Sequence, residues 1–455
     1  MTSTNLSRRL SSHEEGFQDL DSPARKQVVS GVIFLPAPIQ PKILWHRIKQ
    51  FVEKNPLFKS RITNCSTPHW VNDESYSLDN HCSEFSFNDY AQHQILNYVS
   101  QTASTCLDTE HPPWRIALIT SKNSQTNCDF NAIAIWAHHS LIDGLRGMEL
   151  YESLIDENTM DQSVETNPLD CQPSSVVKSP SVISPQCFRL AAAEMLRRPS
   201  ASVFSVSTKA SADRYAMSFV WERKCFRLAR RANRASFQEV LLATFTDAFS
   251  RYCGSEESQY GIRAIIPVAK PDTHATSNST NRHSIGYCTL PTNQPIHNRY
   301  DSIRKSLKTI RSEQEYNVFP TLLSFLRYLP NRLRKKLTYQ LASRAETLIS
   351  LIPGKRSWGH IDGVPVTSLF AQPAIPPGHS LTIGITVNRE KVFVTAQLDP
   401  KCIRDPMKLR VCFEQAYREM NCVQSSQPQA LHKQESAIQK LLGIRLKKQK
   451  HRYAT

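Results

Sequence analysis

Short apolar runs alternate along the chain with stretches in which apolar residues recur every three or four positions. Residues 28–35, 130–137 and 262–268 are apolar runs of strand length, whereas residues 42–54 and 237–252 follow a helical period. The run 130–137 is almost unbroken, which is typical of a strand buried on both faces. The alternation of the two patterns predicts an α/β protein.

The second half of the chain repeats this mixture. Residues 321–348 have a helical pattern interrupted at Pro330, which predicts a half-buried helical pair, and a lipid-facing surface is the alternative. Residues 378–388 and 392–399 alternate around a polar turn, which predicts a hairpin.

Composition divides the chain into four parts. Ser, Pro, Thr and Val crowd residues 158–213, which predicts a linker between an N-terminal lobe, 1–157, and a C-terminal lobe, 214–425. Residues 426–455 form a basic tail. A solvated tail is one interpretation, and a weak anchor to anionic membrane is the other, because Ile438, Leu441 and Leu446 have helical spacing.

The apolar run 130–137 leads directly into candidate chemistry. It is followed by His138 and His139, then by Asp143 and Gly144, and then by a helical apolar pattern. Histidine can accept and return a proton near neutral pH. Successive strand residues point to opposite sides, so one histidine would act and the other would pack. Asp143 could orient His139 or form a structural ion pair, and Gly144 leaves room for a substrate.

Other kinds of site lack their sequence signatures. Opposed side chains argue against a metal pair at His138 and His139, and no third ligand stands at zinc spacing, so we expect no metal. The patterns GxxxxGK[ST] and GxGxxG do not occur, and neither does GxSxG. The sequence therefore indicates no bound cofactor and no serine nucleophile of the α/β-hydrolase type.

Charge narrows the choice of partner. The 455 residues carry a formal net charge of +16, which suggests an anionic partner. Lipid headgroups and the phosphates of coenzyme A are candidates, and nucleic acid ranks behind them because no zinc-finger or RNA-binding signature is present. The N-terminus has no apolar signal-peptide core, no apolar run reaches membrane-spanning length, and the 12 cysteines are widely spaced. We expect a cytoplasmic protein.

The spacing HHxxxDG, His138 to Gly144, resembles the signature of acyltransferases with the chloramphenicol-acetyltransferase-like fold. The segments before it resemble, in the same order, the N-terminal half of the wax ester synthase/diacylglycerol acyltransferase (WS/DGAT) family. Trp70 and Trp114 belong to these segments and are expected to be core aromatics. The matching residues are Pro56, Phe58, Arg61, Trp70, Asp73, Tyr76, Leu78, His81, Leu107, Asp108, Pro112 and Trp114.

The C-terminal half resembles the same family with one departure. Residues that match its motifs are Pro267, Val268, Asn281, Leu290 and Pro291. Where the family usually has Asn-Asp at a helix start, this chain has Gln238 and Glu239, each one methylene longer. Any hydrogen bond made there by the shorter pair must therefore differ in this protein.

The resemblance implies two similar lobes, each a mixed sheet flanked by helices, with a channel between them. It implies an O-acyltransferase in which His139 acts as general base and moves a fatty acyl group from acyl-CoA to a long-chain alcohol or diacylglycerol. In this superfamily the motif aspartate usually pairs with an arginine, for which Arg263 and Arg282 are candidates. A peripheral contact with anionic membrane or a lipid droplet stays open.

Two residues are expected to contact substrate, and other activities stay open beside the main one. Gln238 is a candidate substrate-binding residue. Asn281 could bind an oxyanion or simply cap its loop. The alternatives are an alcohol acetyltransferase, a condensation-type enzyme that uses a carrier-protein thioester, and a non-catalytic relative.

Overall fold

The fold was analysed in a computed structural model of the whole chain. It describes residues 7–420 except 106, 109, 123–128, 157–188, 191, 194–195, 197–203, 205–209, 258–260, 270–282, 313–316 and 353. Most of the expected linker, the basic tail, Asn281 and Arg282 therefore lie outside the described residues.

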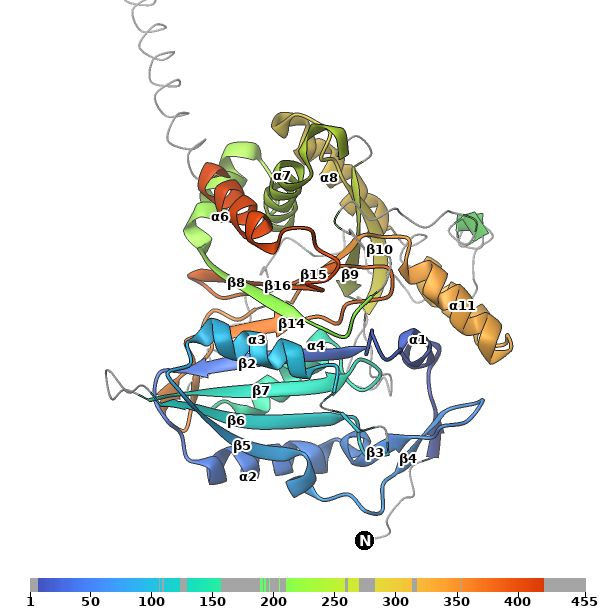
Figure 1. Ribbon diagram of the computed structural model, residues 1–455, viewed down its shortest axis with the longest axis vertical. Helices are drawn as coiled ribbons and strands as arrows, with labels where there is room; N and C mark the ends of the chain where they lie inside the picture. Colours follow the sequence, from blue (N-terminus) through green and yellow to red (C-terminus); the bar gives the residue numbers. More distant parts are fainter. Residues whose placement is uncertain are drawn as a thin grey trace, which may run out of the picture.

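The described chain forms two lobes, one above the other in Figure 1, each built on a mixed sheet. The first sheet has the order β14-β2-β7-β6-β5, with only β5 and β6 parallel. Its strands are β2 (Val28–Leu35), β5 (Cys82–Asn88), β6 (Trp114–Lys122), β7 (Phe130–His138) and β14 (Ser368–Gln372). The strands expected at residues 28–35 and 130–137 are confirmed.

The second sheet has the order β10-β9-β11-β15-β16-β8, in which β11 runs parallel to both of its neighbours. The expected hairpin is confirmed as β15 and β16, which pair antiparallel. The strands are β8 (Tyr215–Glu222), β9 (Ile262–Ala269), β10 (His283–Leu290), β11 (Thr347–Leu351), β15 (Leu381–Val387) and β16 (Lys391–Leu398). This gives the expected α/β architecture of two lobes with mixed sheets.

Strand β14 joins the lobes because it lies in the first sheet although its residues belong to the range expected for the second lobe. It pairs antiparallel with β2, and the Ser30 hydroxyl donates to Gln372 Oε1 at 2.7 Å. Gly384 of β15 lies against it, where a Cβ atom would come within 2.1 Å of the Ala371 carbonyl oxygen. A glycine is therefore required for this close backbone approach, and the two sheets meet at β14.

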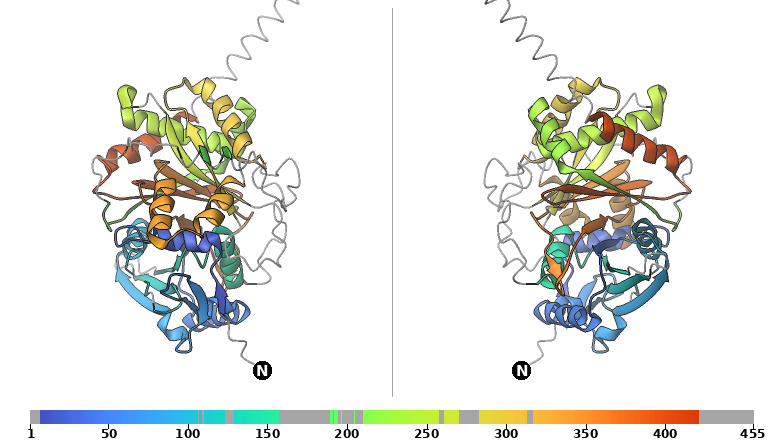
Figure 2. Two further views of the ribbon diagram at one scale, coloured as in Figure 1. Left: turned by 90° about the vertical axis from the view of Figure 1, so that its right-hand side faces the viewer. Right: turned by 90° about the vertical axis from the view of Figure 1, so that its left-hand side faces the viewer.

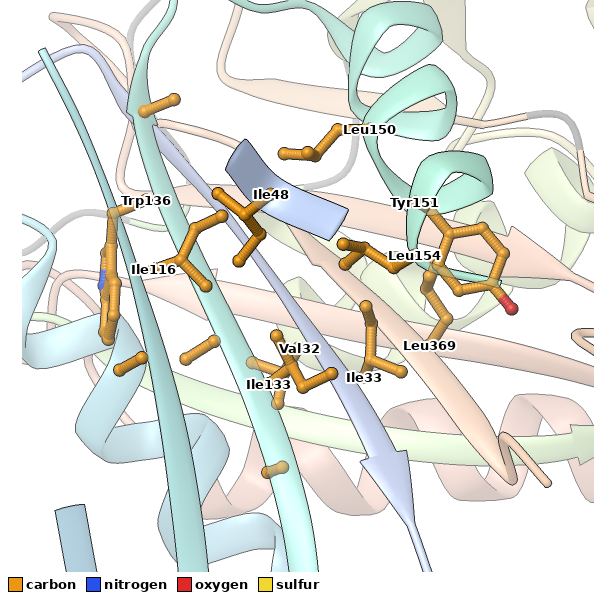
Figure 3. Packing of buried hydrophobic residues seen from close by; sticks show 14 of the residues in the cluster. Val32, Ile33, Ile48, Ile116, Ile133, Trp136, Leu150, Tyr151, Leu154 and Leu369 are labelled. Carbon is orange, nitrogen blue, oxygen red and sulfur yellow. The ribbon is translucent and has the colours of Figure 1, made fainter. Parts of the chain in front are cut away.

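Helices flank both sheets. In the first lobe, α2 (Pro41–Lys54) and α4 (Gly144–Leu154) pack on one face, and α3 (Gln92–Thr102) lies on the other, where it also contacts β8 of the second sheet. Figure 3 shows Tyr151 and Leu154 of α4 packed beside Ile33 of β2 and Leu369 of β14. The second lobe carries α6 (Arg223–Asn233), α7 (Phe237–Glu257), α8 (Ile296–Ile310) and a helix over residues 406–420.

Helices α1 (Ser12–Leu20), α10 (Val318–Leu326) and α11 (Asn331–Ala342) pack together beside the seam between the lobes (Figure 2). The helical pair broken at Pro330 is confirmed as α10 and α11. Its expected end at residue 348 is wrong, because residues 347–351 form β11 in the middle of the second sheet. Pairing with strands on both sides overrides the helical spacing there.

Short elements complete the described chain. Helix α1 was not expected, because the N-terminus has a polar sequence, although Ser11 and Glu14 form a capping box that starts it. The remaining elements are β1 (Ser7–Arg9), η1 (Pro56–Lys59), β3 (Ser60–Ile62), β4 (His69–Asn72), η2 (Leu78–Asn80), β12 (His360–Ile361) and β13 (Val364–Pro365).

Candidate active site

The HHxxxDG segment forms the turn between β7 and α4 at the seam. His138 is the last residue of β7, and its amide donates to the Pro113 carbonyl at 2.9 Å. The His139 amide donates to the Gln27 carbonyl at 2.8 Å. These bonds fix the backbone of both histidines independently of their side chains.

His138 faces away from the cavity and packs in the first lobe. Its Nδ1 accepts from the Ser140 amide at 3.1 Å and lies 3.2 Å from Gln18 Nε2. Its Nε2 lies 3.3 Å from a carboxylate oxygen of Asp21. With both ring nitrogens engaged and 5% of the residue exposed, His138 is a positioned core histidine.

His139 faces a cavity of about 340 Å³ between the lobes, whose lining is mainly apolar. Strands β2, β7, β9 and β14 and helices α1, α4, α10 and α11 all contribute to its wall. The Phe17 ring stacks on His139 with centroids 3.9 Å apart and planes 7° apart. Protein atoms surround the imidazole, and its remaining accessible surface belongs to the cavity.

Burial controls the protonation of His139. Burial, with a smaller contribution from repulsion by the nearby His283, lowers the pKa of this imidazole to about 3. At neutral pH the ring is therefore uncharged. An uncharged imidazole is the form required of a general base.

Asp143 is the N-cap of α4 and is 3% exposed. Its Oδ1 accepts from the Arg146 amide at 2.9 Å, and its Oδ2 lies 3.3 Å from His283 Nδ1. Of the two arginine partners expected from the sequence, Arg263 stacks over Tyr287 and donates to the Arg344 carbonyl. The other, Arg282, lies outside the described residues.

Gly144 lines the cavity immediately after Asp143. A Cβ atom built there would come 3.2 Å from Ile352 Cγ1. That is tighter than ordinary van der Waals contact, so a larger residue at this position would require Ile352 to shift.

The second lobe contributes Gln238, which lines the cavity near the start of α7. Its Oε1 accepts from Arg311 Nη2 at 2.5 Å. Glu239 plays a different part, because with Ser236 it makes both reciprocal bonds of a capping box, at 3.1 and 3.2 Å, and it pairs with Arg304. Gln238 thus lies at the candidate site, and Glu239 starts the helix.

Among the cavity residues that the sequence did not single out, His13, Phe17 and His283 lie closest together around His139. The His283 ring lies 5.7 Å from the rings of both His139 and His13. The Ser11–Glu14 capping box could have revealed the helix that carries His13 and Phe17. No local signal could have joined His283 to Asp143, because 140 residues separate them.

Four aromatic and histidine residues of the earlier family motifs form a stack in the first lobe. His81 lies between Tyr76 and Trp114, with centroids 5.3 and 4.5 Å away, and Phe58 meets Trp114 edge-on. The Trp114 indole donates to the Phe58 carbonyl at 2.7 Å. The core interpretation of Trp70 and Trp114 is confirmed, since they are 0% and 2% exposed.

Neither a candidate metal site nor a membrane-spanning helix is found among the described residues. Within them, no group of three or more His, Cys, Asp or Glu side chains is placed to hold a metal ion. No described helix combines the length and apolar character needed to cross a bilayer.

Structural comparison shows the fold. A wax ester synthase/diacylglycerol acyltransferase from Marinobacter aquaeolei VT8 superposes with a TM-score of 0.60 at 18% identity, over 92% of this chain and all of that one. The starter condensation domain of rhizomide synthetase, in a complex with C8-CoA and Leu-SNAC, gives 0.59 at 13% identity, over 92% and 95%. Both likenesses concern the two-lobed fold.

Sequence comparison shows the family. The model of the wax ester synthase/diacylglycerol acyltransferase catalytic domain matches residues 10–243, and the WS/DGAT C-terminal domain matches residues 280–421. An O-acyltransferase WSD of Acinetobacter baylyi is 22% identical over 71% of this chain and 77% of its own. Wax ester synthase/diacylglycerol acyltransferase 5 of Arabidopsis thaliana is 22% identical over 87% and 90%. The chain belongs to the wax ester synthase/diacylglycerol acyltransferase family.

Proposed function

We propose that the protein transfers a fatty acyl group from acyl-CoA to the hydroxyl group of a long-chain alcohol or diacylglycerol. The observation that carries this proposal is the uncharged His139 imidazole at the wall of an apolar cavity between the lobes. His139 Nδ1 is buried, so Nε2 is the nitrogen that we assign to the reaction. Family membership supports acyl transfer as the reaction class.

The proposed reaction requires one base and no covalent enzyme intermediate. Nε2 of His139 takes the hydroxyl proton while the acceptor oxygen attacks the thioester carbonyl carbon. The carbon–sulfur bond then breaks, and the proton passes from the imidazolium to the departing thiolate. The ester and free coenzyme A result, and His139 is again uncharged.

The surroundings of His139 suit this chemistry. Holding both substrates in one cavity replaces a collision in solution by an oriented encounter. An apolar lining limits the entry of water, which would otherwise hydrolyse the thioester. Phe17 stacked on the imidazole limits the orientations that the ring can adopt.

A carrier-protein thioester is the alternative donor. The fold similarity to a starter condensation domain favours keeping this alternative, although that domain was itself crystallised with C8-CoA. Parallel assays with palmitoyl-CoA and palmitoyl-acyl carrier protein separate the two. Transfer from the carrier protein alone would replace acyl-CoA in the proposal.

A lipid surface is the proposed partner beyond the substrates themselves. The α10–α11 hairpin lines the cavity from its inner side, through Phe319, Leu323, Thr338 and Ala342. Its outer side exposes apolar and basic side chains together, which suits a peripheral contact with anionic lipid. They are Phe325, Tyr328, Leu333 and Tyr339 with Arg332, Lys335 and Lys336.

The proposal is tested with purified protein, palmitoyl-CoA and either hexadecanol or dioleoylglycerol. We expect wax ester or triacylglycerol from the wild type and a loss of about 10²- to 10⁴-fold in kcat for His139→Ala, the usual contribution of a general base. His46→Ala is the matched control, since His46 is exposed on α2. Undiminished turnover of the His139→Ala protein would exclude the proposed role.

A further inference from the structure

Helix α6 is densely basic, and it ends shortly before Gln238, which lines the cavity. From Arg223 to Arg234, six of twelve residues are Arg or Lys and none is acidic. Lys224, Arg227, Arg231 and Arg234 are exposed. Phe226 and Ala229 anchor the opposite side in the core of the second lobe.

Four arginines of this segment surround one hollow at the surface. Arg227, Arg230, Arg231 and Arg234 line a space of about 300 Å³ together with Ala235. One or two cations suffice to complement the negative carboxyl end of a helix. Four arginines around a single hollow exceed that need and form a site suited to phosphate, which guanidinium groups bind with paired hydrogen bonds.

Contacts connect this hollow with the wall of the cavity. Arg304 Nη2 donates to the Arg234 carbonyl at 3.1 Å and lies 3.3 Å from Glu239 Oε2. Arg311 follows seven residues later, so it lies on the same face of α8 as Arg304. Arg311 lines the cavity and donates to Gln238.

Together these residues make a basic feature that we call the arginine belt. It runs from the cavity wall to the surface hollow and consists of Arg311, Arg304, Arg234, Arg231, Arg230 and Arg227. Asp301 and Glu239 each contact Arg304, so its charge is balanced and the positive charge of the belt lies mainly at the hollow. Among the described residues, arginines and Ala235 alone line the hollow itself.

We propose that the arginine belt binds the phosphate groups of the coenzyme A nucleotide and so sets the side from which the thioester donor enters. The acyl chain and the sulfur would reach the cavity beside Gln238 and Arg311, with the nucleotide outside. This inference rests on the proposed function, because it assigns one end of the acyl-CoA substrate. It also explains why a polar pair, Gln238 and Arg311, stands in a mainly apolar wall.

The experiment compares three donors: palmitoyl-CoA, its 3′-dephospho analogue and S-palmitoyl-pantetheine. We expect the double variant R231Q/R234Q to raise KM for palmitoyl-CoA roughly fivefold to tenfold. It should leave kcat, and all constants for S-palmitoyl-pantetheine, within about twofold. Added salt should raise the wild-type KM for palmitoyl-CoA and change that for S-palmitoyl-pantetheine less, because screening weakens exposed charge pairs.

The variant K49Q/K54Q is the matched control, since it removes two exposed charges from α2 of the other lobe. Calorimetric titration with free coenzyme A and with pantetheine gives a readout that needs no transfer. An equal effect of R231Q/R234Q on all three donors, or unchanged affinity for free coenzyme A, overturns the inference. Absence of transfer from every donor, with coenzyme A still bound through the belt, would instead count against the proposed function.

Discussion

The two walls of the cavity hold their polar side chains in different ways. On the first-lobe wall, His139 and Asp143 lie within one strand–turn–helix segment, and backbone bonds to Gln27 and Arg146 fix them. On the second-lobe wall, Gln238 and His283 start different elements and depend on side-chain partners far away in the sequence.

This difference shows which part of the cavity wall the local sequence constrains and which part can vary. A contiguous turn keeps its geometry only if its residues and their spacing are kept together, and HHxxxDG is intact here. Side chains held by remote partners can be replaced when the partner changes as well. Gln238 with Arg311, and His283 with Asp143, are such pairs. We infer that the second-lobe wall adjusts a site in which His139 of the first-lobe wall is the proposed base.

The largest expected effect distinguishes His139 from His138, because substitution of the first should reduce activity and substitution of the second should reduce stability. We expect His139→Gln to lose acyl transfer by at least about 10²-fold and to keep the wild-type urea midpoint. His138→Ala should lower the free energy of unfolding by roughly 1–3 kcal/mol, because the Ser140 amide and Asp21 lose their partner. Activity and urea unfolding of both variants measure this. Equal losses of activity would show that the two residues share one role.

The next effect concerns the contact across the seam between Asp143 and His283. Asp143→Ala should destabilise the protein by about 1 kcal/mol through the lost helix cap, and lower kcat further because His283 is released beside His139. His283→Asn keeps the cap, so it should lower kcat without the loss in stability. A double-mutant cycle on kcat measures the coupling, and additive effects would contradict a functional contact.

Acid should destabilise the fold through buried histidines. Burial lowers the pKa of His13 and His139 to about 3 and that of His379 to about 4. Below about pH 6.5 the unfolded chain binds protons at these residues while the folded protein does not, so stability falls as pH falls. Well below pH 6.5, each of these histidines adds about 1.4 kcal/mol to the loss of folding stability for every unit by which the pH falls.

Urea midpoints at pH 7.5 and pH 5.0 test this expectation. His13→Phe should reduce the loss by roughly a quarter to a third, because it removes one of four buried histidines with a lowered pKa, His81 being the fourth, and keeps an aromatic ring against Phe319. Equal midpoints at the two pH values would mean that these imidazoles are protonated in the folded state.

The smallest expected effect concerns Gln238. Gln238→Asn shortens the side chain that Arg311 binds and should change KM for acyl-CoA by roughly threefold, with kcat unchanged. Glu239→Gln, which preserves a capping-box residue, is the control. A change in kcat rather than KM would move Gln238 from donor binding to the chemical step.

Much of the fold could be predicted because its signals are local. The apolar runs that became β2 and β7 and the helical stripe of α2 are periodic over whole elements. The same holds for the order of motifs that ends in HHxxxDG. Helix α1 was accessible in principle through Ser11 and Glu14, but its buried residues Glu15 and Asp19 pair with arginines from the end of α10 and from α11.

The sequence by itself determined the segment to which we assign the chemistry: a buried strand, a tight turn with two histidines, and a helix capped by Asp143. Only the tertiary structure decided which histidine faces the cavity, that His283 meets Asp143, and that β14 belongs to the first sheet. The physical reason is that strand and helix periods act over a few residues, whereas these contacts join side chains and strands more than a hundred residues apart. Packing of the two lobes selects them, and no local pattern encodes that packing.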